Sequence, residues 1–226
     1  MFDIFIDSAV REDVLPLLET GIFAGVTTNP TLLRQAGTTL DTLPALVETL
    51  RGAGARTVFV QTWGATQDEL TQHAELLRGR CGDVGIKVPI GVAGLALVHQ
   101  LKAQEVPTLL TGVYKREQIL PAIQSGADWV APYVGRMSDN GRDGVQQTIA
   151  MQRVLDSTGS ATRLLVASIR SAGDVADMAE AGVNGFTMRP ARWRELVEDE
   201  LTTEAIETFE NHMKDVDPAA TAGRGI

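Results

Sequence analysis

The sequence predicts an α/β protein of one domain, a (β/α)8 barrel (TIM barrel) with an extra C-terminal helix. Short apolar runs alternate with longer amphipathic stretches along nearly the whole chain. The short runs are apolar at both odd and even positions, as in parallel strands covered on both faces. Glycines separate the amphipathic stretches from the runs that follow, and no linker or change of composition divides the chain.

Eight short runs are the predicted strands. Most are rich in β-branched or aromatic residues, which favour extended structure. They are Phe2–Ile6, Ala24–Thr27, Thr57–Gln61, Gly85–Val88, Thr108–Thr111, Trp129–Val134, Leu164–Ser168 and Gly185–Met188.

Between these runs, apolar residues recur at a spacing of three or four, which predicts helices with one buried face. Examples are the series Val10, Val14, Leu17, Leu18; Leu70, Ala74, Leu77; and Val175, Met178, Ala179. Glycine makes up 22 of 226 residues, about a tenth against an average of about 7%. Five of them stand where a left-handed residue would end a helix: Gly21, Gly54, Gly82, Gly126 and Gly182.

Eight strand–helix units with right-handed crossovers close into a barrel. An open doubly wound sheet is the alternative, but no G-x-G-x-x-G follows the first strand. We expect the barrel to span residues 1–200, a C-terminal helix to span 201–216, and residues 217–226 to form a flexible tail. The apolar stripe Ile206, Phe209, Met213 and Val216 would fold back or pack on a neighbouring subunit.

Composition narrows the function classes. The formal net charge is -9, the pI is near 4.8, and no run of Lys and Arg interrupts that balance, so we expect neither nucleic acid nor an anionic membrane as a partner. A single cysteine, Cys81, excludes an internal disulfide and suits a reducing compartment. There is no basic N-terminal region and no apolar run of the roughly 20 residues that span a bilayer. The expected location is the cytoplasm.

Polar residues end nearly every predicted strand, and barrel active sites lie at those C-terminal strand ends. The candidates are Asp7, Thr27 with Asn29, Gln61, Lys87, Thr111, Tyr133, Ser168 and, less clearly, Arg189. Lys87 is the most informative, because Ile86 and Val88 would face the helices and Lys87 would then face the barrel interior. Burial disfavours the ammonium form, and a neutral amine is a nucleophile for carbonyls. A lysine that snorkels from the strand end, paired with Asp7, is the equal alternative.

The other candidates have structural alternatives. Asp7 could cap the helix that follows, in competition with Ser8, and Asn29 before Pro30 could cap a helix as well. Gln61 and Thr111 could be satisfied core polar groups, and the Tyr133 ring could simply be buried.

Positive residues follow the sixth and seventh strands, where barrels often bind phosphate. Arg136 and Arg170, with Ser168, would give charge-assisted bonds to an anionic substrate, although each arginine alone could be a surface residue. Three scattered histidines and one cysteine give no metal-ligand spacing.

These motifs together resemble the small transaldolase-like family. Ala24-Gly25-Val26-Thr27-Thr28-Asn29-Pro30 resembles its second-strand signature, and Ile86-Lys87-Val88-Pro89 resembles its Schiff-base segment. The segments 131–136 and 167–170 resemble its sixth and seventh strand ends. The resemblance extends to about Val216. It implies a barrel, a Schiff base on Lys87, no metal or organic cofactor, and rings of five subunits or paired rings of ten, with the last helix lying across a neighbour.

Two residues indicate the subgroup. Transaldolases of this family carry glutamate at the third strand end and usually phenylalanine in the Ala-Pro-Tyr motif, where fructose-6-phosphate aldolases carry glutamine and tyrosine. This chain has Gln61 and Tyr133, while Trp63-Gly64 departs from the pattern. The resemblance therefore implies reversible cleavage of fructose 6-phosphate to dihydroxyacetone and glyceraldehyde 3-phosphate, with a transaldolase of the pentose phosphate pathway as the alternative. A sugar-phosphate-binding barrel without chemistry is the third option.

In the aldolase, Lys87 would be the nucleophile. Tyr133 would be the acid/base, through a water held by Gln61 and Thr111. Asp7, Asn29 and Thr27 would orient the lysine and the substrate hydroxyls, and Arg136, Ser168 and Arg170 would hold the phosphate.

Overall fold

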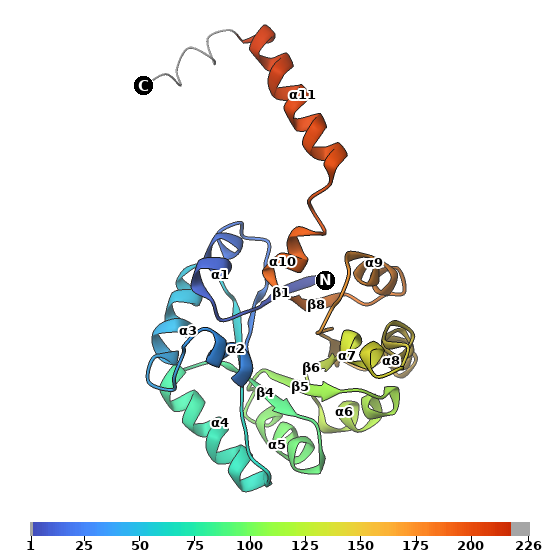
Figure 1. Cartoon of the computed structure of the whole chain (residues 1–226). Coiled ribbons are helices and arrows are strands. Elements are labelled where there is room, and N and C mark those ends of the chain that lie inside the picture. Colours follow the sequence, from blue (N-terminus) through green and yellow to red (C-terminus); the bar gives the residue numbers. More distant parts are fainter. Residues whose placement is uncertain (1, 218–226) are drawn as a thin grey trace.

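Eight parallel strands form the centre of the molecule in a computed structural model that describes residues 2–217 (Figure 1). They are β1 (Asp3–Asp7), β2 (Gly25–Thr27), β3 (Thr57–Gln61), β4 (Gly85–Pro89), β5 (Thr108–Val113), β6 (Trp129–Pro132), β7 (Arg163–Leu164) and β8 (Gly185–Met188). Each overlaps a predicted run, although β6 ends at Pro132 and Val134, predicted to lie in that strand, begins a helix. The seventh is shorter than predicted, because beyond Leu164 only isolated bridges at Val166 and Ala167 continue its pairing.

The strands close into a ring. Their order is β7-β6-β5-β4-β3-β2-β1-β8, and the segment after β7 pairs with β8 through the bridge Val166–Phe186. There the Val166 N–H donates to the Gly185 carbonyl at 2.9 Å, and the Thr187 N–H donates to the Val166 carbonyl at 2.8 Å. The predicted (β/α)8 barrel is therefore confirmed, and the open sheet is excluded.

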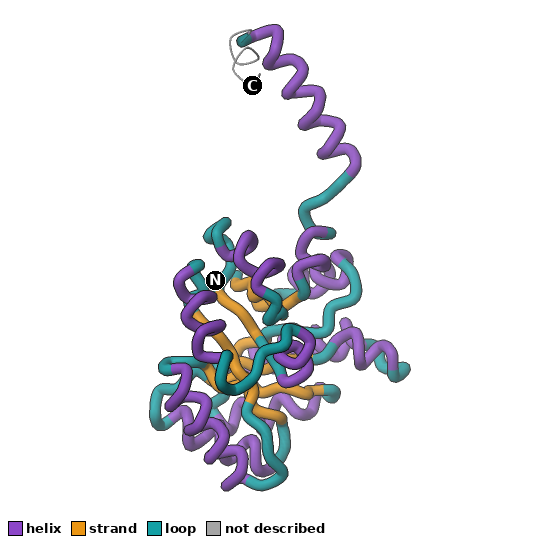
Figure 2. The backbone as a smooth tube through the Cα atoms, turned by 60° about the vertical axis from the view of Figure 1, so that its left-hand side comes forward, coloured by secondary structure: helices purple, strands orange, loops and turns teal. Residues whose placement is uncertain are grey.

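Helices surround the strands on the outside of the ring (Figure 2). They are α1 (Arg11–Leu18), α2 (Pro30–Gln35), α3 (Leu43–Gly52), α4 (Gln67–Cys81), α5 (Val92–Lys102), the 3-10 turn η1 (Arg116–Gln118), α6 (Ile119–Ser125), α7 (Val134–Asp139), α8 (Gly144–Thr158), α9 (Ala172–Glu180) and α10 (Pro190–Arg194). A last helix, α11 (Glu200–Val216), stands apart from them (Figure 1). The five glycines predicted to end helices all have positive φ, between 71° and 106°.

Two apolar layers hold the barrel. The larger lies between strands and helices and contains Ile86 and Val88, as predicted. The smaller fills the barrel interior with Phe5, Phe59, Leu109, Ala131 and Leu165. Gly85 makes room for this filling, because a Cβ there would lie 2.6 Å from the Phe59 ring.

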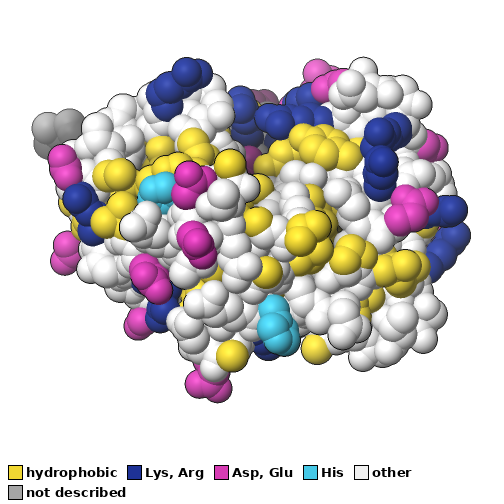
Figure 3. Space-filling model, turned by 90° about the horizontal axis from the view of Figure 1, so that it is seen from below, with side chains coloured by type: hydrophobic (Ala, Val, Ile, Leu, Met, Phe, Trp, Pro, Cys, Tyr) yellow, Lys and Arg dark blue, Asp and Glu magenta, His cyan; other side chains and the backbone are white. Residues whose placement is uncertain are grey.

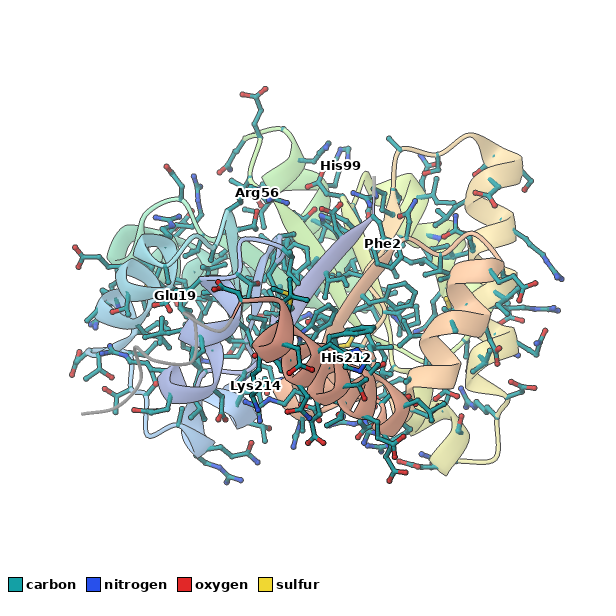
Figure 4. All side chains as sticks on the ribbon, turned by 90° about the horizontal axis from the view of Figure 1, so that it is seen from above. Phe2, Glu19, Arg56, His99, His212 and Lys214 are labelled. Atoms are coloured by element: carbon teal, nitrogen blue, oxygen red, sulfur yellow. The ribbon has the colours of Figure 1, made fainter. Side chains whose placement is uncertain are left out.

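An ion pair closes the N-terminal end of the barrel, which we call the floor. The Arg163 guanidinium donates to Asp3 at 2.6 Å and lies 4.2 Å from the centre of the Trp129 ring. Arg56, labelled in Figure 4, approaches Asp3 from outside at 3.6 Å. Side chains therefore fill the floor, and the charges of Asp3 and Arg163 are paired there. This leaves the opposite end of the barrel for a site.

Helix α11 runs away from the barrel (Figures 1 and 2), with His212 and Lys214 along it (Figure 4). None of its residues is buried, and Phe209 is 64% exposed. Its packing on a neighbouring subunit stays a prediction. The predicted tail, apart from Asp217, lies outside the described residues. No helix within the described part of the chain is both long and apolar enough to cross a membrane.

Candidate active site

Lys87 lies on β4, level with the last residue of β3, toward the end of the barrel opposite the floor, which we call the open end. Its side chain is 1% exposed, and its Cα stands opposite Gln61 on β3 and Leu109 on β5. Since Ile86 and Val88 pack outside the ring, the alternation of a strand directs Lys87 inward. A lysine that snorkels to the surface does not fit this burial, so that alternative is wrong.

A chain of hydroxyls leads to Asp7 at the end of β1. Thr27 donates from Oγ1 to Asp7 Oδ1 at 2.7 Å, and the Thr27 and Thr187 hydroxyls are 2.6 Å apart. Thr27 and Thr187 are both buried. Asp7 is therefore held by side chains inside the barrel and does not cap α1. The residue before that helix is Val10, which makes no side-chain cap.

Thr111 and Tyr133 form a second pair, on β5 and just after β6. The Thr111 Oγ1 and the Tyr133 hydroxyl are 2.7 Å apart. Tyr133 is half-buried, so its phenol is fixed by Thr111 while part of the side chain stays accessible. This arrangement suits a group that exchanges a proton with a bound molecule.

Gln61 is half-buried at the end of β3 and borders a cavity of about 500 Å³ between β3 and α2, which Trp63 also lines. The Trp63 ring stacks on His73 at 4.0 Å between centroids, and His73 Nδ1 lies 2.6 Å from the Trp63 carbonyl oxygen. The stacked rings of Trp63 and His73 thus form a wall beside Gln61. This is the place where Trp63-Gly64 departs from the expected sequence pattern.

The predicted anion-binding residues come from two adjacent segments. Ser168 has a φ of 60°, a rare value for a residue other than glycine. The Gly135 N–H donates to the Ser168 carbonyl at 2.8 Å, and a Cβ at Gly135 would lie 2.3 Å from that oxygen. Only glycine permits this approach of α7 to the end of β7.

The two predicted phosphate-binding arginines differ in their partners. Arg170 donates to Asp139 at 2.5 Å in an exposed ion pair. Arg136 donates to the Tyr114 hydroxyl at 3.3 Å, and its guanidinium lies 5.1 Å from the Tyr133 ring centre. The hydrogen bond to Tyr114 raises the pKa of Arg136, and the charge of Asp7 acts in the same direction. Arg136 is therefore an exposed cation whose hydrogen-bond partner is a neutral phenol.

Two predicted residues need a closer description. Asn29 caps α2, because its Oδ1 accepts from the Leu32 N–H at 3.0 Å, so the capping interpretation is confirmed. For the eighth strand, Arg189 is exposed, and the inward residue at this strand end is Thr187. Our sequence reasoning missed Thr187. The alternation of β8, with Phe186 and Met188 in the outer core layer, is the signal that could have found it.

The described residues contain no cluster of three or more His, Cys, Asp or Glu that could hold a metal ion. On the face seen from below in Figure 3, basic and acidic side chains are interspersed with hydrophobic atoms, and no broad basic field stands out.

Solved structures with the same fold are distant in sequence. The thiamine phosphate pyrophosphorylase from Pyrococcus furiosus aligns with a TM-score of 0.56 and 16% identity, covering 83% of this chain and 85% of the other. A mutant flavocytochrome b2 with pyruvate bound aligns with a TM-score of 0.60 and 14% identity, covering 84% and 57%. At these identities they show the fold alone.

Other proteins are more similar to this chain in sequence. Proteins named probable transaldolase are 32% identical in Bartonella bacilliformis, covering 91% of this chain and 93% of the relative, and 33% identical in Herpetosiphon aurantiacus, covering 96% and 97%. Residues 4–222 match the family described as transaldolase/fructose-6-phosphate aldolase. A match over nearly the whole length, on a barrel with a buried lysine at its open end, leaves one conclusion: the chain belongs to the transaldolase/fructose-6-phosphate aldolase family.

Proposed function

We propose that this protein is a Schiff-base aldolase that reversibly cleaves fructose 6-phosphate into dihydroxyacetone and glyceraldehyde 3-phosphate. One observation carries the proposal: Lys87 is almost fully buried at the open end of a barrel whose floor is closed. An amine buried inside a barrel is suited, in its neutral form, to attack a ketone.

The reaction begins with the neutral Lys87 Nζ adding to the ketone carbon. Loss of water then leaves an iminium ion. The hydroxyl on the fourth carbon gives up its proton, the bond between the third and fourth carbons breaks, and its electron pair becomes the enamine. Glyceraldehyde 3-phosphate leaves as the aldehyde. Protonation of the enamine and hydrolysis release dihydroxyacetone and restore the amine.

Tyr133 is the proposed acid/base of the carbon–carbon step. Its hydroxyl already lies 2.7 Å from Thr111, and Gln61 stands across from Lys87 on the next strand. A water bound among Gln61, Thr111 and Tyr133 would relay the proton.

The remaining residues orient the substrate. Asp7, fixed by Thr27, would hold the lysine and the substrate hydroxyls. Asn29 would contribute through its amide NH2 group, which the cap of α2 leaves as a donor. Arg136, Ser168 and Arg170 would hold the phosphate, with Arg170 sharing its charge with Asp139.

Borohydride reduction in the presence of dihydroxyacetone tests the proposal. We expect a mass increase, retained after denaturation, on the peptide that contains Lys87, and none in Lys87→Ala. An adduct that persists in Lys87→Ala, or no adduct in the wild type, contradicts the mechanism. The second outcome would favour a barrel that binds sugar phosphates without chemistry.

A transaldolase that transfers the dihydroxyacetone unit between sugar phosphates, as in the pentose phosphate pathway, is the second candidate. The names of the relatives favour it, while Gln61 and Tyr133 favour the aldolase. Fructose 6-phosphate supplied without an acceptor aldehyde separates the two. An aldolase releases dihydroxyacetone continuously, whereas a transaldolase stops at the bound intermediate.

We also propose that the chain forms a homo-oligomer, a pentamer or decamer, through α11, and that it works in the cytoplasm. The exposed apolar side chains of α11 support the first proposal, and the single cysteine supports a reducing compartment.

A further inference from the structure

Tyr114, which follows β5 directly, has no role in the mechanism above and yet is held at three points. Its N–H donates to Gln118 Oε1 at 2.8 Å, and its carbonyl accepts from Arg142 at 2.6 Å. Its ring meets the Tyr133 ring edge-on, with 5.5 Å between centroids. Backbone and ring are therefore fixed against the edge of the candidate site.

The Tyr114 hydroxyl accepts a hydrogen bond from Arg136 Nη1 at 3.3 Å. A phenol is a neutral acceptor, so the guanidinium keeps its charge and its other N–H donors for a bound anion. Arg170 differs, because Asp139 already neutralises much of its charge. Within the described residues, no carboxylate forms such an ion pair with Arg136.

The surroundings of Tyr114 also favour an anion. A cavity of about 400 Å³ opens beside it, lined by Tyr114, Lys115, Gln118, Arg136, Met137, Asn140 and Arg142. Three of these residues are cationic and none is acidic, on a chain whose net charge is -9. A local group of cations concentrates an anionic ligand against the overall charge of the protein.

We propose that Tyr114 is a positioning residue, whose hydroxyl holds the Arg136 guanidinium at the edge of the site and so sets the preference for a phosphorylated acceptor aldehyde. This inference rests on the proposed function. Tyr114 acts through Arg136 and does not itself touch the reacting atoms.

The substitution Tyr114→Phe tests it, because it removes the hydroxyl and keeps the ring and the backbone contacts. With dihydroxyacetone as donor, kcat/KM is measured for glyceraldehyde 3-phosphate and for glyceraldehyde. We expect the ratio of the two to fall about tenfold, mainly through KM for the phosphorylated aldehyde, as for the loss of a hydrogen bond to a charged group.

A double-mutant cycle separates positioning from packing. Arg136→Met should lower the ratio further, and Tyr114→Phe in the Arg136→Met background should have no additional effect on it. Arg153→Met, which removes an exposed guanidinium on α8, controls for the loss of one positive charge. Additive effects, or an equal fall for both aldehydes in Tyr114→Phe, would overturn the inference.

Binding of inorganic phosphate, measured by calorimetry, gives a readout that does not need turnover. We expect a dissociation constant about tenfold weaker in Tyr114→Phe than in the wild type. If phosphate binding weakens while no variant and no wild-type protein forms a borohydride adduct, the proposed aldolase function fails and the positioning of Arg136 stands. If adducts form and phosphate binding does not change, the inference about Tyr114 fails alone.

Discussion

At the scale of single residues, the hydrogen bonds around Asp7 form a chain in which each hydroxyl donates toward the carboxylate. An ionised carboxylate only accepts hydrogen bonds, so the Thr27 hydroxyl donates its one proton to Asp7. Thr187 must then donate to Thr27 across their 2.6 Å contact. Each hydroxyl polarises the next, which strengthens the hold on the carboxylate. Asp7 thus has one fixed orientation although it stands at a strand end.

Thr187→Val should destabilise the protein by about 1 kcal/mol, because it leaves the buried Thr27 oxygen without its donor. It should also lower kcat, since Asp7 loses its fixed orientation. Urea unfolding and steady-state kinetics measure the two effects. Thr187→Ser keeps the hydroxyl and should restore most of both. A Val variant with wild-type stability and rate would show that the chain of hydroxyls is not needed.

Strand alternation was enough to predict that Lys87 faces the barrel interior, and polar strand ends were enough to find Thr111 and Tyr133. Three features of the site were not predicted correctly from the sequence. Thr187 was missed because Arg189 was taken as the polar end of its strand. The capping alternative for Asp7 was wrong, because the Thr27 hydroxyl comes from a neighbouring strand. The pairing of Arg170 with Asp139 depends on how the segment before α9 meets the end of α7, which local patterns do not encode.

At the scale of elements, helix ends are fixed by side chains near them in sequence. Helix α4 begins with a capping box. Thr66 Oγ1 accepts from the Glu69 N–H at 3.2 Å, and Glu69 Oε2 accepts from the N–H groups of Thr66 at 3.2 Å and Ala65 at 2.7 Å. Gly82, with a φ of 71°, ends the same helix. The wall formed by Trp63 and His73 depends on this start, because His73 lies on α4.

Thr66→Ala should lower the free energy of unfolding by about 1 kcal/mol, the usual effect of losing such a cap. Thr66→Ser should leave it close to the wild-type value. Chemical denaturation at neutral pH compares the three proteins. Equal stability of the alanine and serine variants would mean that water replaces the cap.

The same cap predicts a pH dependence. The backbone N–H groups of Ala65 and Thr66 lower the pKa of Glu69. A carboxyl with a lowered pKa in the folded state stabilises the protein above its unfolded pKa, and this contribution disappears as the pH falls through the folded pKa. We therefore expect Glu69→Gln to be less stable than the wild type at pH 7, with a difference that shrinks as the pH falls below the unfolded pKa of Glu69. A difference that grows on acidification would contradict this assignment.

The observed ends of β3 and β8 agree with the ends predicted from the sequence, because residues near each end determine where the strand stops. The seventh strand did not, because its apolar run continues to Ser168 while regular pairing stops at Leu164. Beyond that point the chain bends so that Ser168 takes its positive φ and meets Gly135. This bend is set by contact with α7, which lies far away in the sequence.

At the scale of the whole molecule, the barrel buries its apolar side chains and α11 exposes its own. Ile206 is 56% exposed, Phe209 64% and Met213 52%. An apolar stripe of this kind on an isolated helix marks an association surface. The completed barrel supplies no partner for it within the described chain, so we expect the partner to be another copy.

Deletion of the chain from Leu201 onward should therefore reduce the oligomer to smaller species. Phe209→Glu in the full chain should do the same, because it places a charge in the apolar stripe that the second copy would cover. Glu207→Lys also changes the charge of α11, outside the apolar stripe, and serves as the control. Sedimentation velocity measures the mass of each species. A truncated protein that keeps the full oligomeric mass would refute the role of α11.

The floor of the barrel has a consequence for protein engineering. Asp3, Arg163 and Trp129 fasten the ring at one end, while the candidate chemistry occupies the other. A library that randomises Gln61 and Arg170, with Lys87 and Thr187 kept, leaves this fastening untouched. We expect its members to keep the closed ring and to differ in which aldehydes the proposed aldolase accepts. Because the residues that fasten the ring and the randomised residues lie at opposite ends of the barrel, selectivity can be changed without changing the residues that close the ring.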